Sequence, residues 1–260
     1  MATPVALSIA GSDPSGGAGL QADLKTFHQL GVYGEAVVTL ITVQNSRGLR
    51  RVETLAAHLV AEQIHAVITD IPPHAAKTGA LGSRAVVEAV AEAAASFAFP
   101  LVVDPVLLSK NGSALLEDGA RCVFANELLP RAFLLTPNLD EASVLTGLAV
   151  ADPDQMAAAA QKLLEMGAAN VLVKGGHLEG DAIDVLVTNT GEHHEFRAPR
   201  IATRHTHGTG CTYSAAITAS LAKGLELIEA IRAAKEFITA AIRTSPGLGA
   251  GSGPLNHFAR

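Results

Sequence analysis

The sequence predicts an α/β fold with a mainly parallel central sheet and helices on both of its faces. Short runs rich in Val, Ile and Leu alternate along the 260-residue chain with longer Ala-rich stretches of helical periodicity, an order typical of parallel β-α units. Several short runs are apolar at successive positions, as strands buried on both faces are. Polar or glycine-rich segments directly follow five of these runs. We expect one domain to span residues 1–260.

The expected elements follow the chain in order. Strands are predicted at 5–9, 36–41, 101–103, 133–135, 171–173 and 183–187, and helices at 19–30, 83–97, 114–128, 139–145, 154–166, 211–223 and 227–243. Within 211–223, Tyr213, Ile217 and Leu221 recur every four residues, and Gly224 follows as a helix stop. The Gly/Pro-rich stretch 245–254 is predicted to be a surface loop or tail.

Composition argues against several classes of protein. With 48% hydrophobic and 17% charged residues, a chain of this length buries enough surface to fold without a disulfide or a structural metal. The net charge of −6 and the lack of a long basic run argue against nucleic acid as a partner. No run reaches about 18 apolar residues, so no membrane span is expected. The N-terminal MATPVALSIAGSD lacks the basic region of a secretory signal and is interpreted as a strand.

The two cysteines, Cys122 and Cys211, do not form the framework of a secreted protein. Cys122 lies inside a predicted apolar helix and is expected to be buried. His193-His194 and His205-x-His207 are a weak signal for a metal site, because zinc needs three or four converging ligands. These features favour a cytoplasmic enzyme without a zinc site.

Five predicted strands end in segments suited to ligand binding. The segments are AGSDPSGGAG at 10–19, TVQN at 42–45, Asp104-Pro105, TPNLDE at 136–141 and KGGH at 174–177. In open α/β sheets ligands bind beyond the carboxyl ends of the strands. Because five such segments fall at that position, we expect them to form one site.

The segment HGTGC at 207–211 leads directly into a predicted helix. Amides at a helix start lack intrahelical partners, and the helix dipole adds positive potential, so this turn is suited to bind an anion such as phosphate. The same position is expected to lower the pKa of the Cys211 thiol. The alternative is a tight turn that opens a packed helix.

The other segments each allow two interpretations. GSDPSGGAG at 11–19 is neither a dinucleotide fingerprint nor a P-loop. In the first interpretation, its glycines admit a flat small ligand that the Asp23 carboxylate would reach. In the second, Asp13 forms an ordinary turn and Asp23 is a solvated helix residue. Asn138 and Glu141 have capping-box spacing, and Glu141 alternatively lies near a metal-bound phosphate. Lys174 either contacts a phosphate or faces solvent at a strand end.

Taken in order, the segments AGSDPSGGAG, QN, KTG, DPV, TPNLDEA, KGGH and THGTGC resemble those of the ribokinase-like superfamily. Within it the chain is similar to the bacterial hydroxymethylpyrimidine/phosphomethylpyrimidine kinases of thiamine biosynthesis, from about residue 5 to residue 257. The resemblance implies a three-layer α/β/α sandwich. It also implies that ATP phosphorylates the hydroxymethyl group of the pyrimidine and then the resulting monophosphate.

The resemblance also implies roles for individual residues. Cys211 would act as the base, and the amides of Gly208, Thr209, Gly210 and Cys211 would form an anion hole. Substrate-binding positions would be Gly11, Asp23, Gln44, Ala80, Val106 and Leu107. Lys174, Asn138 and Thr209 would contact ATP, and Asp104 and Glu141, with Asn138, would order Mg²⁺ and its waters. Typical sugar kinases of the superfamily have aspartate at the position of Cys211.

Two departures from the family pattern and three alternatives remain. Ala80 stands where the family often has Met, and Arg204-His205 stand where it usually has Asn. A pyridoxal or pyridoxine kinase would use the same scaffold, and a pyrimidine-binding regulator would lack turnover. A nicotinamide dehydrogenase would need a glycine fingerprint that the chain lacks. The resemblance also suggests a homodimer.

Overall fold

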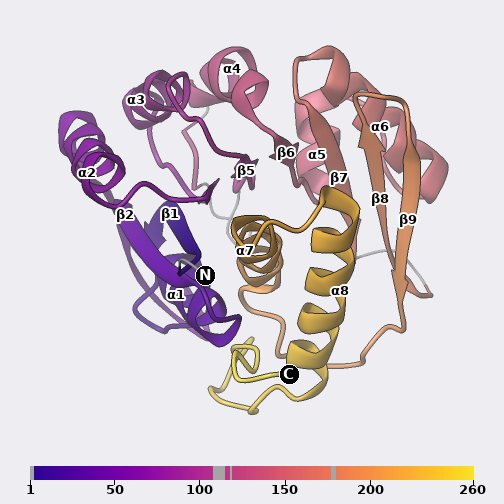
Figure 1. Ribbon diagram of the computed structural model, residues 1–260. Helices are drawn as coiled ribbons and strands as arrows, with labels where there is room; N and C mark the ends of the chain where they lie inside the picture. Colours follow the sequence, from indigo (N-terminus) through magenta and orange to yellow (C-terminus); the bar gives the residue numbers. More distant parts are fainter. Residues whose placement is uncertain (1–2, 108–114, 118, 177–179) are drawn as a thin grey trace.

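A nine-stranded sheet runs through the part of the chain that the computed structural model describes, residues 3–107, 115–117, 119–176 and 180–260 (Figure 1). Its order is β3-β2-β1-β4-β5-β6-β7-β8-β9, parallel from β2 to β7 and antiparallel at β2–β3, β7–β8 and β8–β9. The strands are β1 (Val5–Ser12), β2 (Tyr33–Asn45), β3 (Gly48–Thr54), β4 (Ala75–Thr78), β5 (Leu101–Val103), β6 (Leu134–Leu135), β7 (Asn170–Gly175), β8 (Ala182–Thr188) and β9 (His193–Ala198). The predicted fold class is therefore confirmed.

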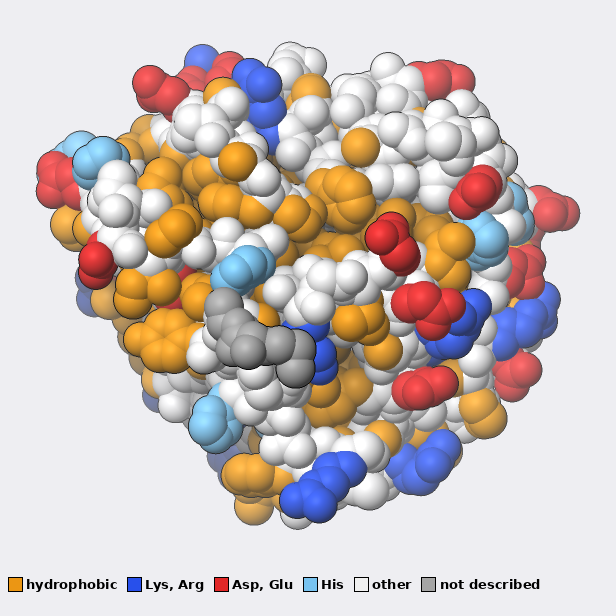
Figure 2. All heavy atoms as spheres, viewed as in Figure 1, with side chains coloured by type: hydrophobic (Ala, Val, Ile, Leu, Met, Phe, Trp, Pro, Cys, Tyr) orange, Lys and Arg blue, Asp and Glu red, His pale blue; other side chains and the backbone are white. Residues whose placement is uncertain are grey.

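Helices cover both faces of the sheet. The helices are α1 (Gly19–Gln29), α2 (Ala57–Asp70), α3 (Arg84–Ala94), α4 (Ala120–Val123), α5 (Leu139–Thr146), α6 (Pro153–Glu165), α7 (Thr209–Ala222) and α8 (Leu227–Arg243), with a π-helical turn η1 (Phe124–Leu128) and a 3₁₀ turn η2 (Leu129–Arg131). One hydrophobic cluster joins α1, α7 and α8 to the sheet, and a second joins α2, α3, α5 and α6 to the opposite face. Acidic and basic side chains lie along the outer face of α8 (Figure 2).

The strands alternate between the two clusters. In β1, Leu7 and Ile9 pack into one cluster and Ala6 into the other. In β5, Val103 packs into the same cluster as Leu7 and Ile9, and Val102 packs into the same cluster as Ala6. Because side chains on a strand point alternately to opposite faces, a strand covered on both sides is apolar at every position. Burying each such Val, Leu or Ile contributes about 1.5–3 kcal/mol.

Four elements were not predicted from the sequence. Strands β3, β4 and β9 have the sequences GLRRVET, AAKT and HHEFRA, whose charged or polar residues mask the strand signal. Helix α2 places Val60 and Ile64 on one buried face. Their four-residue spacing is the sequence signal that indicates this helix. The helix predicted at 114–128 corresponds to α4 and η1, and its first residue lies outside the described residues.

Two glycines bring the loops of the site into contact. Gly19 has φ +54°, and a Cβ atom there would lie 2.2 Å from the Gly11 carbonyl oxygen. Gly208 has φ +81°, and a Cβ atom there would lie 1.8 Å from the Gly17 oxygen. Any other residue would introduce both backbone strain and a clash. The starts of α1 and α7 are therefore packed together through bare backbone.

Two expectations need correction. Cys122 is exposed, because its side chain lies on the outer face of the short α4. The stretch 245–254 is irregular, as predicted, but it packs closely against the chain: a Cβ atom on Gly251 would lie 2.0 Å from the Ser46 oxygen. Among the described residues, no helix combines the length and apolar character that crossing a bilayer requires.

Candidate active site

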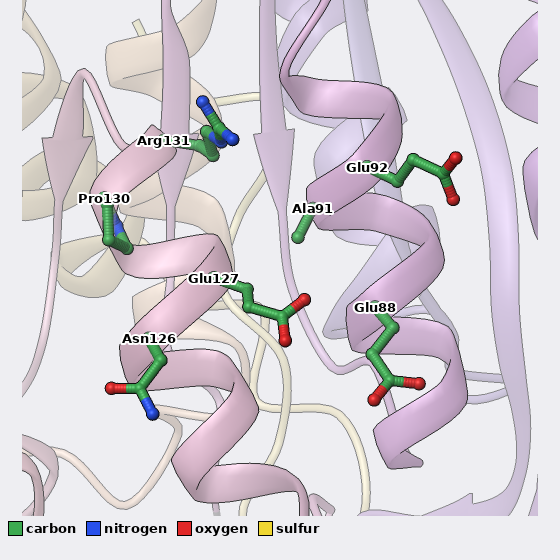
Figure 3. Close-up of a pocket in the computed structure, with 7 residues that line it drawn as sticks. All are labelled: Glu88, Ala91, Glu92, Asn126, Glu127, Pro130 and Arg131. Atoms are coloured by element: carbon green, nitrogen blue, oxygen red, sulfur yellow. The ribbon is translucent and has the colours of Figure 1, made fainter.

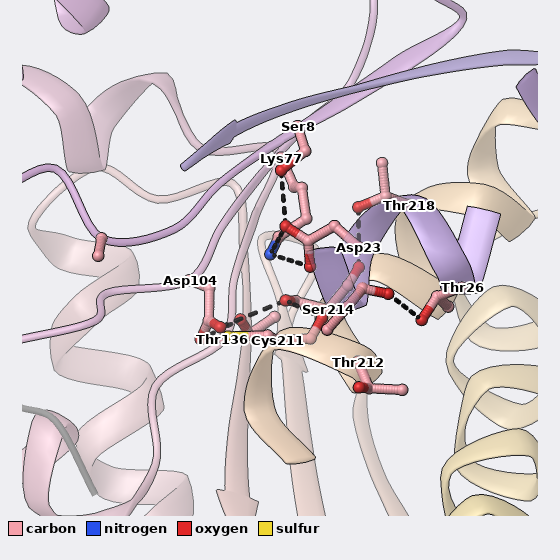
Figure 4. Close-up of polar contacts among 12 residues, drawn as sticks. Ser8, Asp23, Thr26, Lys77, Asp104, Thr136, Cys211, Thr212, Ser214 and Thr218 are labelled. Carbon is pink, nitrogen blue, oxygen red and sulfur yellow. Dashed lines mark hydrogen bonds and ion pairs between the residues drawn. The ribbon is translucent and has the colours of Figure 1, made fainter. Parts of the chain in front are cut away.

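The structure brings most of the predicted site residues together at the carboxyl ends of the parallel strands. Asp104 follows β5 and Asn138 follows β6. Lys174 lies near the end of β7, where its backbone forms an isolated parallel β-bridge with the backbone of Asn138. Asp23 on α1 and Cys211 on α7 lie beside this edge (Figure 4). Lys77 of β4, which sequence reasoning did not single out, lies among them.

A buried ion pair forms the first part of the site. The Lys77 Nζ atom lies 2.9 Å from both oxygens of Asp23, and the Ser8 hydroxyl donates to Asp23 at 2.6 Å. Both charged side chains are fully buried. Although burial alone would lower the pKa of Lys77, the carboxylate raises it above its ordinary value, so the ammonium stays charged. The interpretation of Asp23 as a solvated residue is therefore wrong.

A second buried pair lies nearby. Lys174 donates to Asp104 at 2.7 Å, and Asp104 also accepts hydrogen bonds from Thr136 at 3.2 Å and Ser214 at 3.3 Å. Burial raises the pKa of Asp104, but the charges of Lys174 and Lys77 outweigh it and leave the pKa below its ordinary value. Lys174 is only 11% exposed, so it does not face solvent.

The capping box predicted at the start of α5 is confirmed. Asn138 Oδ1 accepts from the Glu141 amide at 2.9 Å, and Glu141 Oε2 accepts from the Asn138 amide at 2.8 Å. Burial and the charge of Asp104 raise the pKa of Glu141 to about 7, while Lys174 opposes them. Glu141 and Asp104 thus form a pair of carboxylates whose mutual repulsion a cation would relieve.

That pair of carboxylates fits the expectation of Mg²⁺. Mg²⁺ is commonly held by one or two carboxylates together with water and phosphate oxygens, so two carboxylates at a phosphate site suffice. Within the described residues, no group of three or more His, Cys, Asp and Glu side chains is placed to hold a metal ion.

The start of α7 meets both ion pairs. Gly208 precedes α7 in the left-handed conformation, and a Cβ atom on Gly210 would lie 3.3 Å from the Lys174 Nζ atom. The Thr209 hydroxyl donates to the Thr206 oxygen at 2.9 Å, so its side chain stabilises the turn. Unpaired amides at a helix start attract anions, and here they lie beside a buried lysine.

Cys211 departs from the expected electrostatics. Burial raises the pKa of its thiol to about 11, and the charge of Lys77 and the amide of Gly19 only partly oppose this. The expectation of a lowered thiol pKa is wrong, because the loss of solvation outweighs the helix start. The neutral thiol is therefore the resting form at neutral pH.

The remaining predicted substrate residues lie on β1 and β2 and on the loops after β4 and β5. A Cβ atom built on Gly11 would lie 2.5 Å from Leu40 Cδ1 and 3.6 Å from the Cβ atom of Ala80, so these residues are packed against one another. Gln44 lies close enough to Asp13 to lower the pKa of that carboxyl by hydrogen bonding. Val106 is half-buried, whereas Leu107 is 2% exposed and packs into the core.

A surface cleft lies away from these residues. It runs between α3 and the η1–η2 segment and is lined by three glutamates and one arginine (Figure 3). Its lining residues are Glu88, Ala91, Glu92, Asn126, Glu127, Pro130 and Arg131. None of the predicted site residues contributes to it.

Sequence reasoning missed Lys77, Asp13 and His207. A lysine in the apolar run AAKTG signals a buried, paired charge, because unpaired lysine is almost never fully buried. Asp13 had been interpreted as a turn residue. Its contact with His207, 2.9 Å away and 194 residues later, has no local sequence signal.

The nine-stranded, mainly parallel sheet with helices on both faces, which matches solved pyridoxal and phosphomethylpyrimidine kinases, places the chain in the class of ribokinase-like small-molecule kinases. The fold matches the solved structure of an ADP complex of Bacillus subtilis pyridoxal kinase with a TM-score of 0.91, at 39% identity over 99% of this chain and 98% of that one.

The chain belongs to the phosphomethylpyrimidine kinase family, whose sequence model matches residues 13–256. A hydroxymethylpyrimidine/phosphomethylpyrimidine kinase of Rhizobium meliloti is 49% identical to it, over 99% of this chain and 98% of the relative. A bifunctional thiamine biosynthesis protein of Geobacter sulfurreducens is 47% identical over 97% of this chain and 52% of its own length. The family expected from the sequence motifs is thereby confirmed.

Proposed function

We propose that this chain is an ATP-dependent kinase of thiamine biosynthesis. It phosphorylates 4-amino-5-hydroxymethyl-2-methylpyrimidine and then the resulting monophosphate. The observation that carries this proposal is the placement of two buried ion pairs at the start of α7. Lys77–Asp23 lies near Cys211, and Lys174–Asp104 lies against Gly210. The first pair suits an aminopyrimidine, and the second suits the phosphates of ATP.

Gly11 and Ala80, which lie against each other, form one wall of the pyrimidine site, and the partly exposed Val106 forms another. A flat aza-aromatic ring with an amino group needs an acceptor and a donor at fixed positions. The side-chain amide of Gln44 supplies both kinds of group, whereas the fully buried Asp23 contributes its charge from beneath the pocket. Because Lys77 and Ser8 already bond to Asp23, that carboxylate is held in one orientation before substrate arrives.

The phosphoryl group passes from ATP to the hydroxymethyl oxygen. The oxygen forms a bond to the γ-phosphorus, the bond from that phosphorus to the bridging oxygen breaks, and ADP leaves. Lys174 and the amides of residues 208–211 stabilise the charge on the phosphoryl oxygens. Asn138 and Thr209 shape the ATP side. Asp104 and Glu141 would hold Mg²⁺, which would neutralise charge on the phosphates.

The Cys211 thiol first loses its own proton to water, and the resulting thiolate receives the hydroxyl proton late in the transfer. The loose transition state of phosphoryl transfer needs little help from a base, which agrees with a thiol whose resting pKa is about 11. The positive charge of Lys77 favours the thiolate during this step. Cys211 forms no covalent bond to the substrate.

The test is ADP release with Mg²⁺-ATP and, separately, the hydroxymethylpyrimidine, its monophosphate and pyridoxal. Turnover with both pyrimidines supports the two-step kinase. Turnover with pyridoxal alone would support the second candidate, a pyridoxal kinase, which the fold match to the Bacillus subtilis enzyme favours. Binding of the pyrimidine without turnover would make the chain a regulator.

We also propose that the chain acts as one catalytic domain, as a homodimer and in the cytoplasm. The family resemblance supports the dimer, and the composition supports the cytoplasm. Light scattering at micromolar concentration measures the mass, and a value equal to the 26.7 kDa chain would contradict the dimer.

A further inference from the structure

Asp13 is a buried hub in the first glycine-rich loop. It is 1% exposed. Its Oδ2 atom accepts from the amides of Gly17 at 3.2 Å and Ala18 at 2.9 Å, and its Oδ1 atom accepts from the Ser15 amide at 2.8 Å. The Asp13 amide in turn donates to Gln21 on α1 at 2.8 Å. This single carboxylate therefore fixes the path of the loop that leads into α1.

The same carboxylate reaches the loop before α7. His207 Nε2 lies 2.9 Å from Asp13 Oδ2. Counting the side chains alone, that of His207 is 16% exposed and that of Asp13 is 2% exposed. Burial raises the pKa of Asp13, but hydrogen bonds from His207 and Ser15 outweigh it and keep the pKa below its ordinary value. An ionised carboxylate only accepts, so His207 Nε2 is the donor.

The two loops are in direct contact, with no space for additional atoms between them. A Cβ atom on Gly17 would lie 2.7 Å from His207 Cδ2, and one on Gly208 would lie 1.8 Å from the Gly17 oxygen. The His207 amide donates to the Gly253 oxygen at 3.1 Å, so the C-terminal segment holds the histidine from the opposite side. The separation of the two loops therefore depends on the orientation of the imidazole.

We propose that Asp13 and His207 are positioning residues that hold the substrate loop, residues 11–19, against the anion loop, residues 208–211. Neither residue has a part in the reaction described above. This inference rests on the proposed function, because it assigns the two loops to the acceptor and to the phosphoryl group. In-line transfer needs these two partners within a fraction of an ångström of their reacting geometry. The hydrogen bond between Asp13 and His207 sets that distance.

The test compares three variants with the wild-type chain. His207→Phe keeps the ring and removes the donor, whereas His207→Gln keeps a donor near the Nε2 position. His65→Phe is the matched control, because His65 is exposed on α2, far along the chain from both loops. Each variant is measured for kcat and KM with the hydroxymethylpyrimidine and ATP, and for amide hydrogen exchange in the segments 13–18 and 206–212.

We expect His207→Phe to lower kcat about tenfold or more while KM for ATP changes by less than about twofold. His207→Gln is expected to recover most of that loss, and His65→Phe to match the wild type. Exchange should accelerate in both segments in His207→Phe, because each loop loses its contact with the other.

An unchanged kcat in His207→Phe, or faster exchange in 206–212 alone, would overturn the proposal. If His207→Phe does not fold, His207→Asn replaces it, since its shorter amide does not reach Asp13. A wild-type chain without turnover on any acceptor would refute the proposed function, and the exchange comparison would still decide whether Asp13 and His207 couple the loops.

Discussion

At the scale of single residues, Cys211 lies at the proposed catalytic position, but its raised pKa disfavours the thiolate that a base requires. Its thiol is neutral at rest, with a pKa of about 11, so below that value the thiolate fraction rises about tenfold for each unit by which the pH increases. We expect Cys211→Ala to retain ATP binding and to lose most of its turnover, about tenfold in kcat, because the base assists the transfer only late. We also expect kcat/KM of the wild type to rise between about pH 7 and 9, and the variant to lose this rise.

The measurement is the pH profile of ADP release for both proteins, with Cys122→Ala as the control because Cys122 is exposed on α4. Equal pH slopes in the wild type and Cys211→Ala would remove the thiol from the proton transfer.

The Lys77–Asp23 pair has a consequence for stability as well as for binding. Both side chains are fully buried, so Lys77→Met leaves the Asp23 carboxylate buried without its cation. We expect a loss of about 3–5 kcal/mol in the free energy of unfolding, because an uncompensated buried charge is costly. The double variant Lys77→Met/Asp23→Leu should recover most of this stability, since an apolar replacement removes both charges.

Urea unfolding of the single and double variants checks this prediction, and ADP release is measured on the same samples. A double variant that regains stability but not turnover separates the two roles of the pair. A single variant within about 1 kcal/mol of the wild type would contradict the prediction.

At the scale of the element, α5 carries a carboxylate that titrates near neutrality. The Glu141 pKa is about 7 in the folded chain against an ordinary value of 4.5. Between these values the unfolded chain binds fewer protons, so the stability due to this group falls as pH rises. Glu141→Gln keeps the capping-box acceptor and abolishes the titration. We expect the wild type to lose on the order of 2–3 kcal/mol more than this variant between pH 5 and 8.

Unfolding by urea at several pH values measures this difference. Asp154→Asn is the matched control, because Asp154 is exposed in the first turn of a different helix, α6. The same pH slope in the wild type and Glu141→Gln would contradict the prediction.

The elements also show how far sequence patterns reach. The strands around β1, β5 and β7 were predicted because each is buried on both faces and therefore apolar throughout. Strand β4 was not predicted because the charged Lys77 interrupts the apolar pattern of its four-residue sequence AAKT. This lysine is nevertheless part of the site. The capping box was predicted because its two partners are three residues apart. The contact between Asp13 and His207 joins distant loops and depends on the assembled sheet.

At the scale of the whole molecule, the C-terminal segment links parts of the chain that are far apart in sequence. The Gly251 amide donates to Ser46 in the β2–β3 turn at 3.3 Å, the Gly253 oxygen accepts from His207, and His257 lies 3.2 Å from Thr212 of α7. Its position could not be predicted from a Gly/Pro-rich composition, which shows only that regular structure ends there.

Gly251→Ala tests whether this segment supports the site. Its Cβ atom would lie 2.0 Å from the Ser46 oxygen, so the segment must move, at a cost of about 1–3 kcal/mol. The shift is transmitted to Gly253 and His207, so we expect kcat to fall along with the melting temperature. Gly119→Ala is the control, because a Cβ atom there meets no atom of the described residues within 4 Å. Thermal melting and ADP release on both variants give the answer: if Gly251→Ala lowers the melting temperature but leaves kcat unchanged, the C-terminal segment stabilises the chain without positioning His207.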